Sequence, residues 1–109
     1  MTDKYKLVGR EVVPVDDLFE WGEAMEVLRR ADKLQIGHDM VGNIEVSTIF
    51  MGLDMRIMYG EPQLFETMVF EWPIGGGPRR AMDTYRYSTY DQAEESHKAI
   101  VNGLRNKLQ

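Results

Sequence analysis

The sequence predicts one α+β domain of two layers: an N-terminal β-hairpin, a helix, a roughly four-stranded antiparallel meander and a C-terminal helix. Three observations lead to this prediction. The 109 residues make one domain, because two halves would each be too short to bury an adequate core. Apolar residues recur with helical spacing in two segments and with a period of two between them. Consecutive strands usually pair, which favours a meander with both helices packed on one of its faces.

The first elements are local. Residues 5–15 hold two β-prone runs around Gly9 and Arg10, where glycine permits a tight hairpin turn, and Pro14 ends the second run. Residues 1–4 are expected to be frayed. Asp16 or Asp17 can cap a helix that continues to residue 30. Its apolar stripe consists of Leu18, Trp21, Met25 and Leu28.

Period-two patterns predict the sheet. We expect strands at 34–40, 44–53, 64–71 and 81–87, with turn or breaker residues between them. The run 44–53 is apolar on both of its faces, so it is predicted to be a central strand covered on both sides. Thr89 and Gln92 have capping-box spacing and open the last helix. Its buried stripe is predicted to be Ala93, His97, Ile100, Val101, Leu104 and Leu108.

Composition narrows the function classes. The absence of cysteine excludes disulfides, thiolate metal sites and a cysteine nucleophile. No stretch approaches the ~20 apolar residues of a membrane span, so we expect a cytoplasmic protein. A net charge of −5 argues against binding to a phosphate backbone. The eight methionines, among them Met51, Met55, Met58 and Met68, are expected mainly to fill the core.

Three residues are weak candidates for acid/base catalysis. Glu66 could lie beside Asp54 and His97 if its strand faces the last helix. The competing interpretation is structural: Glu66 is in phase with apolar neighbours and would be a buried, hydrogen-bonded carboxylate. His97 lies in the apolar stripe of its helix and could link that helix to the sheet. His38 is the only other histidine, so we expect neither a metal site nor any other cofactor.

The strongest breaker cluster spans residues 72–78 and precedes two arginines. Its glycines and the arginines could cradle phosphate, but no Lys-Ser or Lys-Thr pair follows and no helix begins there, which favours an exposed hairpin loop. The mixture of aromatic, aliphatic and guanidinium groups is typical of protein interfaces. We therefore take Trp72, Ile74, Arg79 and Arg80 as candidate interaction residues.

Three segments carry a family resemblance: residues 46–54 (VSTIFMGLD), 64–70 (LFETMVF) and 86–97 (RYSTYDQAEESH). With the chain around them, from about residue 5 to 105, they resemble a family of small phage and prophage proteins, notably of actinobacteriophages. The resemblance implies a phage setting and an accessory role, and it supplies no catalytic residues to carry over. The chain departs from the family pattern at Met55, where a histidine often stands, and in its extended 72–80 loop.

The sequence thus favours a non-enzymatic accessory protein that binds another protein, with a host or defence factor as one candidate partner and a homodimer formed between sheet faces as another. Two alternatives stay open. One is a small-molecule binder or hydrolase that uses Glu66 and His97. The other is an acidic mimic of nucleic acid, since residues 16–32 hold six acids and two arginines, although their order along the helix also suits the helix dipole.

Overall fold

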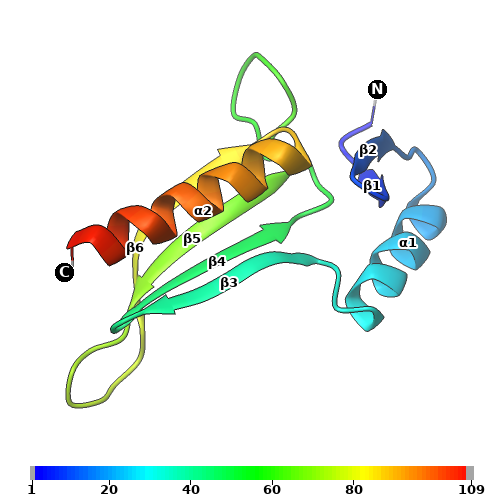
Figure 1. Cartoon of the computed structure of the whole chain (residues 1–109). Helices are drawn as coiled ribbons and strands as arrows, with labels where there is room; N and C mark the ends of the chain where they lie inside the picture. Colours follow the sequence, from blue (N-terminus) through cyan, green and yellow to red (C-terminus); the bar gives the residue numbers. More distant parts are fainter. Residues whose placement is uncertain (1, 108–109) are drawn as a thin grey trace.

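The computed structural model describes residues 2–107 and has the predicted α+β architecture (Figure 1). A hairpin and a helix precede a four-stranded antiparallel sheet of order β3-β4-β5-β6 and a last helix. The bounds are β1 (Tyr5–Val8), β2 (Glu11–Pro14), α1 (Leu18–Arg30), β3 (Gln35–Val41), β4 (Ile44–Phe50), β5 (Phe65–Glu71), β6 (Arg80–Tyr87) and α2 (Tyr90–Lys107). The meander confirms the prediction of the strands and of their order.

Local signals explain the ends of the two helices. Asp17 caps α1 by accepting hydrogen bonds from the backbone N–H groups of Phe19 and Glu20 at 2.8 and 3.0 Å. Thr89 and Gln92 form the predicted capping box of α2, in which the Thr89 hydroxyl accepts from the Gln92 N–H at 3.1 Å and the Gln92 side chain returns to the Thr89 N–H at 3.2 Å.

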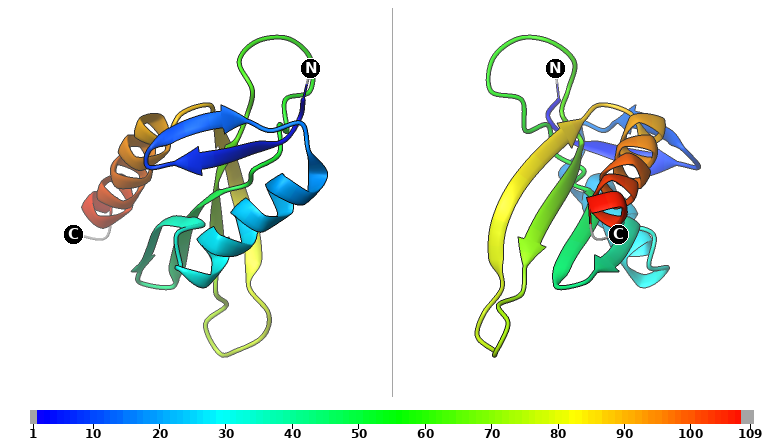
Figure 2. Two further views of the ribbon diagram at one scale, coloured as in Figure 1. Left: turned by 90° about the vertical axis from the view of Figure 1, so that its right-hand side faces the viewer. Right: turned by 60° about the vertical axis from the view of Figure 1, so that its left-hand side comes forward.

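Helix α2 lies across one face of the sheet (Figures 1 and 2), and Leu7 and Val12 of the hairpin pack at the Phe50 end of that face. The cross-strand pairs beneath α2 are Val46 with Val69, Thr48 with Thr67 and Phe50 with Phe65. All six side chains are buried. From α2, Ala93, His97 and Val101 are buried against this face, as the helical spacing predicted, whereas Leu108 lies outside the described residues.

The expectation that both helices pack on one face is wrong. Helix α1 packs against β1 and the end of the sheet near Phe50, and it has no fully buried residue. Its contact point is Gly52, whose carbonyl accepts from the Trp21 indole N–H at 3.0 Å. A Cβ at Gly52 would lie 2.6 Å from Met25 Sδ, and its φ of 72° also favours glycine. This approach, which no local pattern encodes, fixes α1 away from the sheet face.

Three finer expectations also need correction. Residues 2–4 are not frayed: Lys4 bridges to Leu53, and the Thr2 hydroxyl donates to the Val15 carbonyl at 2.6 Å. Strand β4 ends at Phe50, since the chain turns at Gly52. The methionines in and around the central strands do not fill the core, because Met55 and Met58 are exposed and Met51 and Met68 are only half-buried.

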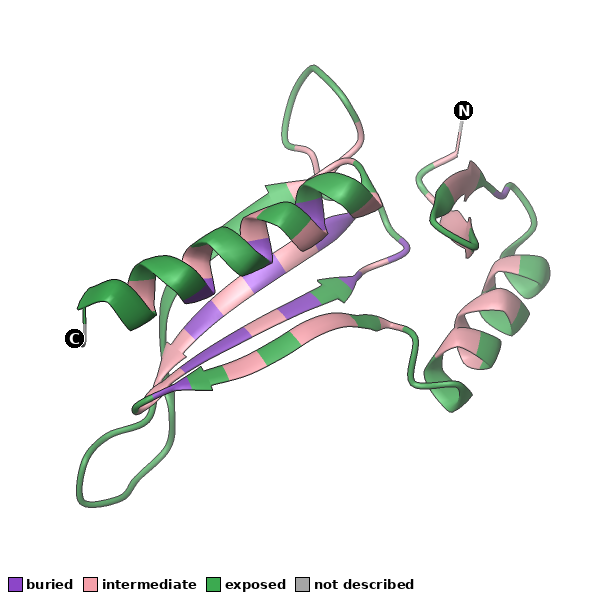
Figure 3. Cartoon of the chain, viewed as in Figure 1, coloured by how far each residue is buried: buried purple, intermediate pink, exposed green. Residues whose placement is uncertain are grey.

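No element among residues 2–107 covers the second face of the sheet, so cover on that side of the central strand stays a prediction that another chain would have to fulfil. Buried positions are concentrated in β4, β5 and α2 (Figure 3), and of the residues described on the second face only Glu45 is buried. On this face Ile49 of β4 is 37% exposed and Met40 of β3 is 48% exposed. We call this surface the open face; it carries His38, Met40, Glu45, Ser47, Ile49, Glu66, Met68, Phe70, Thr84 and Arg86.

Candidate functional site

The three catalytic candidates are not brought together. Glu66 projects onto the open face, where its carboxylate pairs with Arg86 Nε of the neighbouring strand at 3.1 Å. His97 lies on the opposite side, between α2 and the sheet. Asp54 belongs to the loop after β4. Because adjacent residues of a strand point to opposite faces, Glu66 cannot share a site with a group beneath α2.

His97 belongs to a polar chain that runs from the part-exposed Asp39 into the core. Its Nε2 lies 2.7 Å from Asp39 Oδ2, its Nδ1 lies 2.7 Å from Thr48 Oγ1, and Thr48 Oγ1 lies 2.5 Å from Thr67 Oγ1. A carboxylate only accepts, so Nε2 carries a proton and donates to Asp39. The Thr48 hydroxyl lies between the ring and Thr67 and can donate to one of them while it accepts from the other. Both threonines are fully buried, so this acid–imidazole–hydroxyl chain links α2 to the sheet and offers no hydroxyl to a substrate.

Asp54 organises its own loop. Its Oδ1 accepts the backbone N–H groups of Arg56 and Gln63 at 3.0 Å each, and its Oδ2 pairs with Arg56 Nε at 2.8 Å. Burial tends to raise the pKa of this carboxyl, but the two N–H donors and the guanidinium lower it below its ordinary value. All of its partners belong to residues 56–63, so the carboxylate closes the base of the loop.

The most heavily bonded group on the open face is Glu45, which the sequence did not single out. Its Oε1 accepts from Trp72 Nε1 at 3.0 Å and Arg79 Nη1 at 2.7 Å, and its Oε2 accepts from His38 Nε2 at 2.7 Å. The residue is 8% exposed. The hydrogen bond from His38, followed by those from Arg79 and Trp72, lowers the pKa of Glu45 to about 2. One signal was available: Glu45 is the only charged residue in an apolar strand.

The predicted interaction residues divide into anchors and a free tip. Trp72 and Arg79 hold the two ends of the β5–β6 loop against Glu45, and the Arg79 guanidinium stacks over the Phe70 ring at 3.8 Å from its centroid. Arg80 pairs with Glu71 across the strands. Ile74 is 94% exposed at the end of the loop. The anchors extend the open face, whereas Ile74 projects beyond it.

Charge on the open face is balanced. Glu45 is matched by Arg79 and Glu66 by Arg86, so these four ionised groups cancel within the surface. Between the pairs lie the apolar side chains of Met40, Ile49, Met68 and Phe70. The surface is therefore balanced in charge, and it mixes four apolar with six polar side chains, in a chain whose formal charge is −5.

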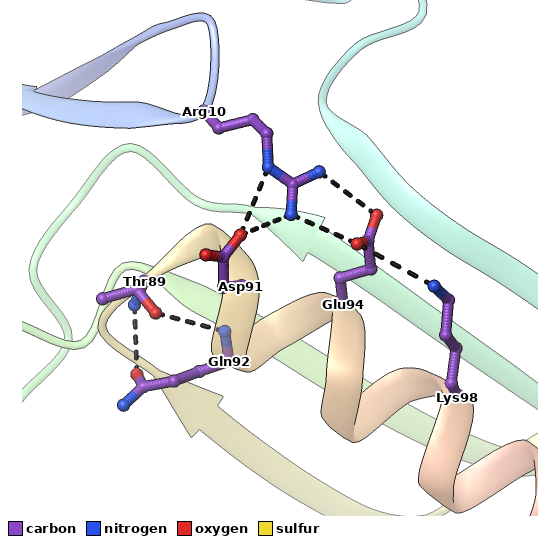
Figure 4. Close-up of polar contacts among 6 residues, drawn as sticks. All are labelled: Arg10, Thr89, Asp91, Gln92, Glu94 and Lys98. Carbon is purple, nitrogen blue, oxygen red and sulfur yellow. Dashed lines mark hydrogen bonds and ion pairs between the residues drawn. The ribbon is translucent and has the colours of Figure 1, made fainter.

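A second polar cluster ties the hairpin to α2 (Figure 4). Arg10, at the hairpin turn, pairs with Asp91 and with Glu94 at 3.1 Å, and its guanidinium stacks over the Tyr90 ring at 4.1 Å from its centroid. The hydrogen bonds to Glu94 and Asp91 raise the pKa of Arg10 above its ordinary value, and Arg10 lowers that of Glu94. These groups are exposed and mutually paired, so the cluster orients two elements.

Three of the six acids in residues 16–32 have partners within the chain. Asp17 is the N-cap, Glu20 pairs with Lys6 at 3.5 Å, and Glu26 pairs with Arg29 and Arg30 at 2.6 and 3.0 Å. The bond from Arg29, with help from Arg30, lowers the pKa of Glu26 to about 2. This arrangement leaves half of these carboxylates to imitate a phosphate track.

Comparison of the chain with protein families, curated proteins and solved structures finds no match. Among residues 2–107, no helix is long and apolar enough to cross a membrane. Within the same part of the chain, no group of three or more His, Asp or Glu side chains is placed to hold a metal ion. The open face, extended by Trp72 and Arg79, is the candidate functional site that the geometry supports best.

Proposed function

We propose that this chain is a non-enzymatic accessory protein that binds another folded protein through the open face. The observation that carries the proposal is a sheet face without cover, on which apolar side chains lie between ion pairs that cancel one another. Protein-binding surfaces commonly combine apolar and aromatic side chains with polar groups that already have partners. The sequence resemblance to phage and prophage proteins supports a setting in the host cytoplasm, with a host or defence factor as the partner.

The chemistry of the face specifies the contact surface of that partner. Both arginines and both glutamates already have partners, so the face gains little from a highly charged ligand and would lose its own pairs to one. Met68 and Phe70 lie at its centre and Trp72 at its margin, and flexible or aromatic side chains of this type form the cores of protein interfaces. The partner is therefore a protein with an uncharged, mainly apolar contact surface.

A site-specific photocrosslink tests the proposal. We would place p-benzoylphenylalanine at Met68, in the open face, or at Asn102, an exposed polar residue of α2, and irradiate each protein in host cells. The expected result is one covalent adduct from position 68 and none from position 102. Binding of the identified protein, remeasured with purified components, should be lost in Met68→Arg and kept in Asn102→Arg. Adducts from position 102 alone, or from neither position, would contradict the proposal.

A further inference from the structure

Strand β6 is an edge of the sheet, and none of the described strands pairs with its outer side. It is the last strand in the order β3-β4-β5-β6, and it lies at the side remote from the hairpin and α1 (Figures 1 and 2). Seven of its eight residues are exposed. It contains neither proline nor lysine, and its bulge lies near the start of the strand, so the edge from Asp83 to Tyr87 is regular. Its outer row of backbone N–H and C=O groups is thus available to another strand.

An apolar groove runs beside this edge, on the α2 side of the sheet. Met82 and Tyr85 of β6 form one wall, and Ile100, Gly103 and Leu104 of α2 form the other. Tyr85 is 42% exposed. Helix α2 therefore does not reach far enough to cover the last strand. Apolar lining and free backbone donors occur on the same margin, and these are the two features that a docked β-strand satisfies.

We infer that a second copy of this chain occupies the edge, with the two β6 strands pairing antiparallel around Tyr85 to make a continuous eight-stranded sheet. The first argument is electrostatic. Each copy carries −5, but β6 presents no cluster of like charges: its two arginines pair with Glu71 and Glu66, and its one acid is Asp83. Two acidic chains can thus meet along this strand without bringing their acidic clusters together. The inference is separate from the proposed function, because the edge is not part of the open face.

Side-chain pairing selects the register. The register shift opposite Val69 and Phe70 leaves Asp83–Tyr87 as the regular part of β6, and Tyr85 is its centre. A two-fold axis at Tyr85 places the two Tyr85 rings together and sets each Asp83 opposite Tyr87 of the second copy, whose hydroxyl can donate to the carboxylate. An axis at Asp83 would instead oppose two carboxylates. One strand buries less than the ~800 Å² per partner of a standard interface, so the dimer is weak and concentration-dependent.

Single-cysteine crosslinking tests this pairing, since the chain has no cysteine of its own. Residues opposite each other across antiparallel strands lie within disulfide range, so Tyr85→Cys should give a disulfide-linked dimer under mild oxidation. Two controls report other modes of pairing. Met40→Cys, at a position as exposed as Tyr85, reports the opposite edge, β3, and Met68→Cys reports pairing between open faces. Circular dichroism of each reduced variant would verify its fold.

Sedimentation of cysteine-free protein supplies the second measurement. The native chain should show a monomer–dimer equilibrium, and Tyr85→Arg, which sets two like charges opposite each other, should raise the dissociation constant by roughly tenfold or more. Met40→Arg should leave it unchanged. A Tyr85→Cys protein that stays monomeric, or crosslinking only at Met40 or Met68, would overturn the inference. If Tyr85→Cys does not crosslink but the photocrosslink from position 68 to a partner protein is still found, this pairing is refuted and the proposed function is not.

Discussion

Glu45 should make the stability of this protein depend on pH in a way that one substitution can isolate. The carboxylate is almost fully buried and accepts from His38, Arg79 and Trp72, and its pKa falls from 4.5 to about 2. A carboxyl with a lowered folded-state pKa stabilises the native state fully above the pKa of the unfolded chain. That contribution is lost as the pH falls from about 4.5 toward about 2.

The size of the effect follows from the shift and from the exposure of the partners. Taken in full, the change in pKa corresponds to about 3 kcal/mol of free energy of unfolding. The side chains of His38 and Arg79 are 42% and 43% exposed, so solvent screens both interactions. We therefore expect Glu45→Gln, which keeps the shape and an acceptor oxygen but removes the charge, to cost about 1–2 kcal/mol at neutral pH.

The assay is urea unfolding of the native chain and of Glu45→Gln at pH values from about 7 down to about 3. The difference in free energy should be constant above about pH 5 and shrink toward zero in acid, because protonated Glu45 resembles glutamine. Glu66→Gln, on the same face but paired only with Arg86, is the matched control and should show a smaller difference. Equal stability at neutral pH, or a difference that persists unchanged in acid, would refute the reasoning.

Two further predictions concern the core. Gly52→Ala should lower the free energy of unfolding by about 1–3 kcal/mol, because it combines a positive φ with a clash against Met25. The control is Gly60→Ala, at a positive φ in open space, which should lose only the part due to backbone strain. Thermal unfolding of the two variants measures the difference. Thr48→Val should lower the free energy of unfolding by about 1–3 kcal/mol, since it leaves the buried Thr67 hydroxyl without its hydrogen-bond partner. Adding Thr67→Val should recover part of that loss, and chemical denaturation of the single and double variants measures both effects.

The elements were predictable because their signals are local. The turn at Gly9, the cap at Asp17 and the capping box of Thr89 each depend on residues within four positions, and all three are present. The helical spacing also indicated that His97 faces the sheet, although its actual partners, Asp39 and Thr48, lie more than forty residues away.

What the sequence could not provide depends on contacts between distant segments. The position of α1 is set by Trp21 and Met25 against Gly52, and no periodicity reports that approach. Alternation correctly divided β4 into two faces, but it could not say which of the two faces the chain itself covers. The surroundings of Glu45 were missed for the same reason, since its three donors come from β3 and from both ends of the β5–β6 loop.

The placement of α1 connects the two proposals. Helix α2 lies on one face of the sheet and α1 is held at its end by Gly52, so neither helix covers the open face, and Met82 and Tyr85 of β6 stay exposed beside α2. A two-fold axis through paired β6 strands stands perpendicular to the sheet, so it would keep the open faces of both copies on one side. Such a dimer would present two copies of the same neutral surface in one plane. A partner with repeated binding sites would then bind the dimer more tightly than it binds one face. The gain would come from the raised effective concentration of the second face and would need no new contact.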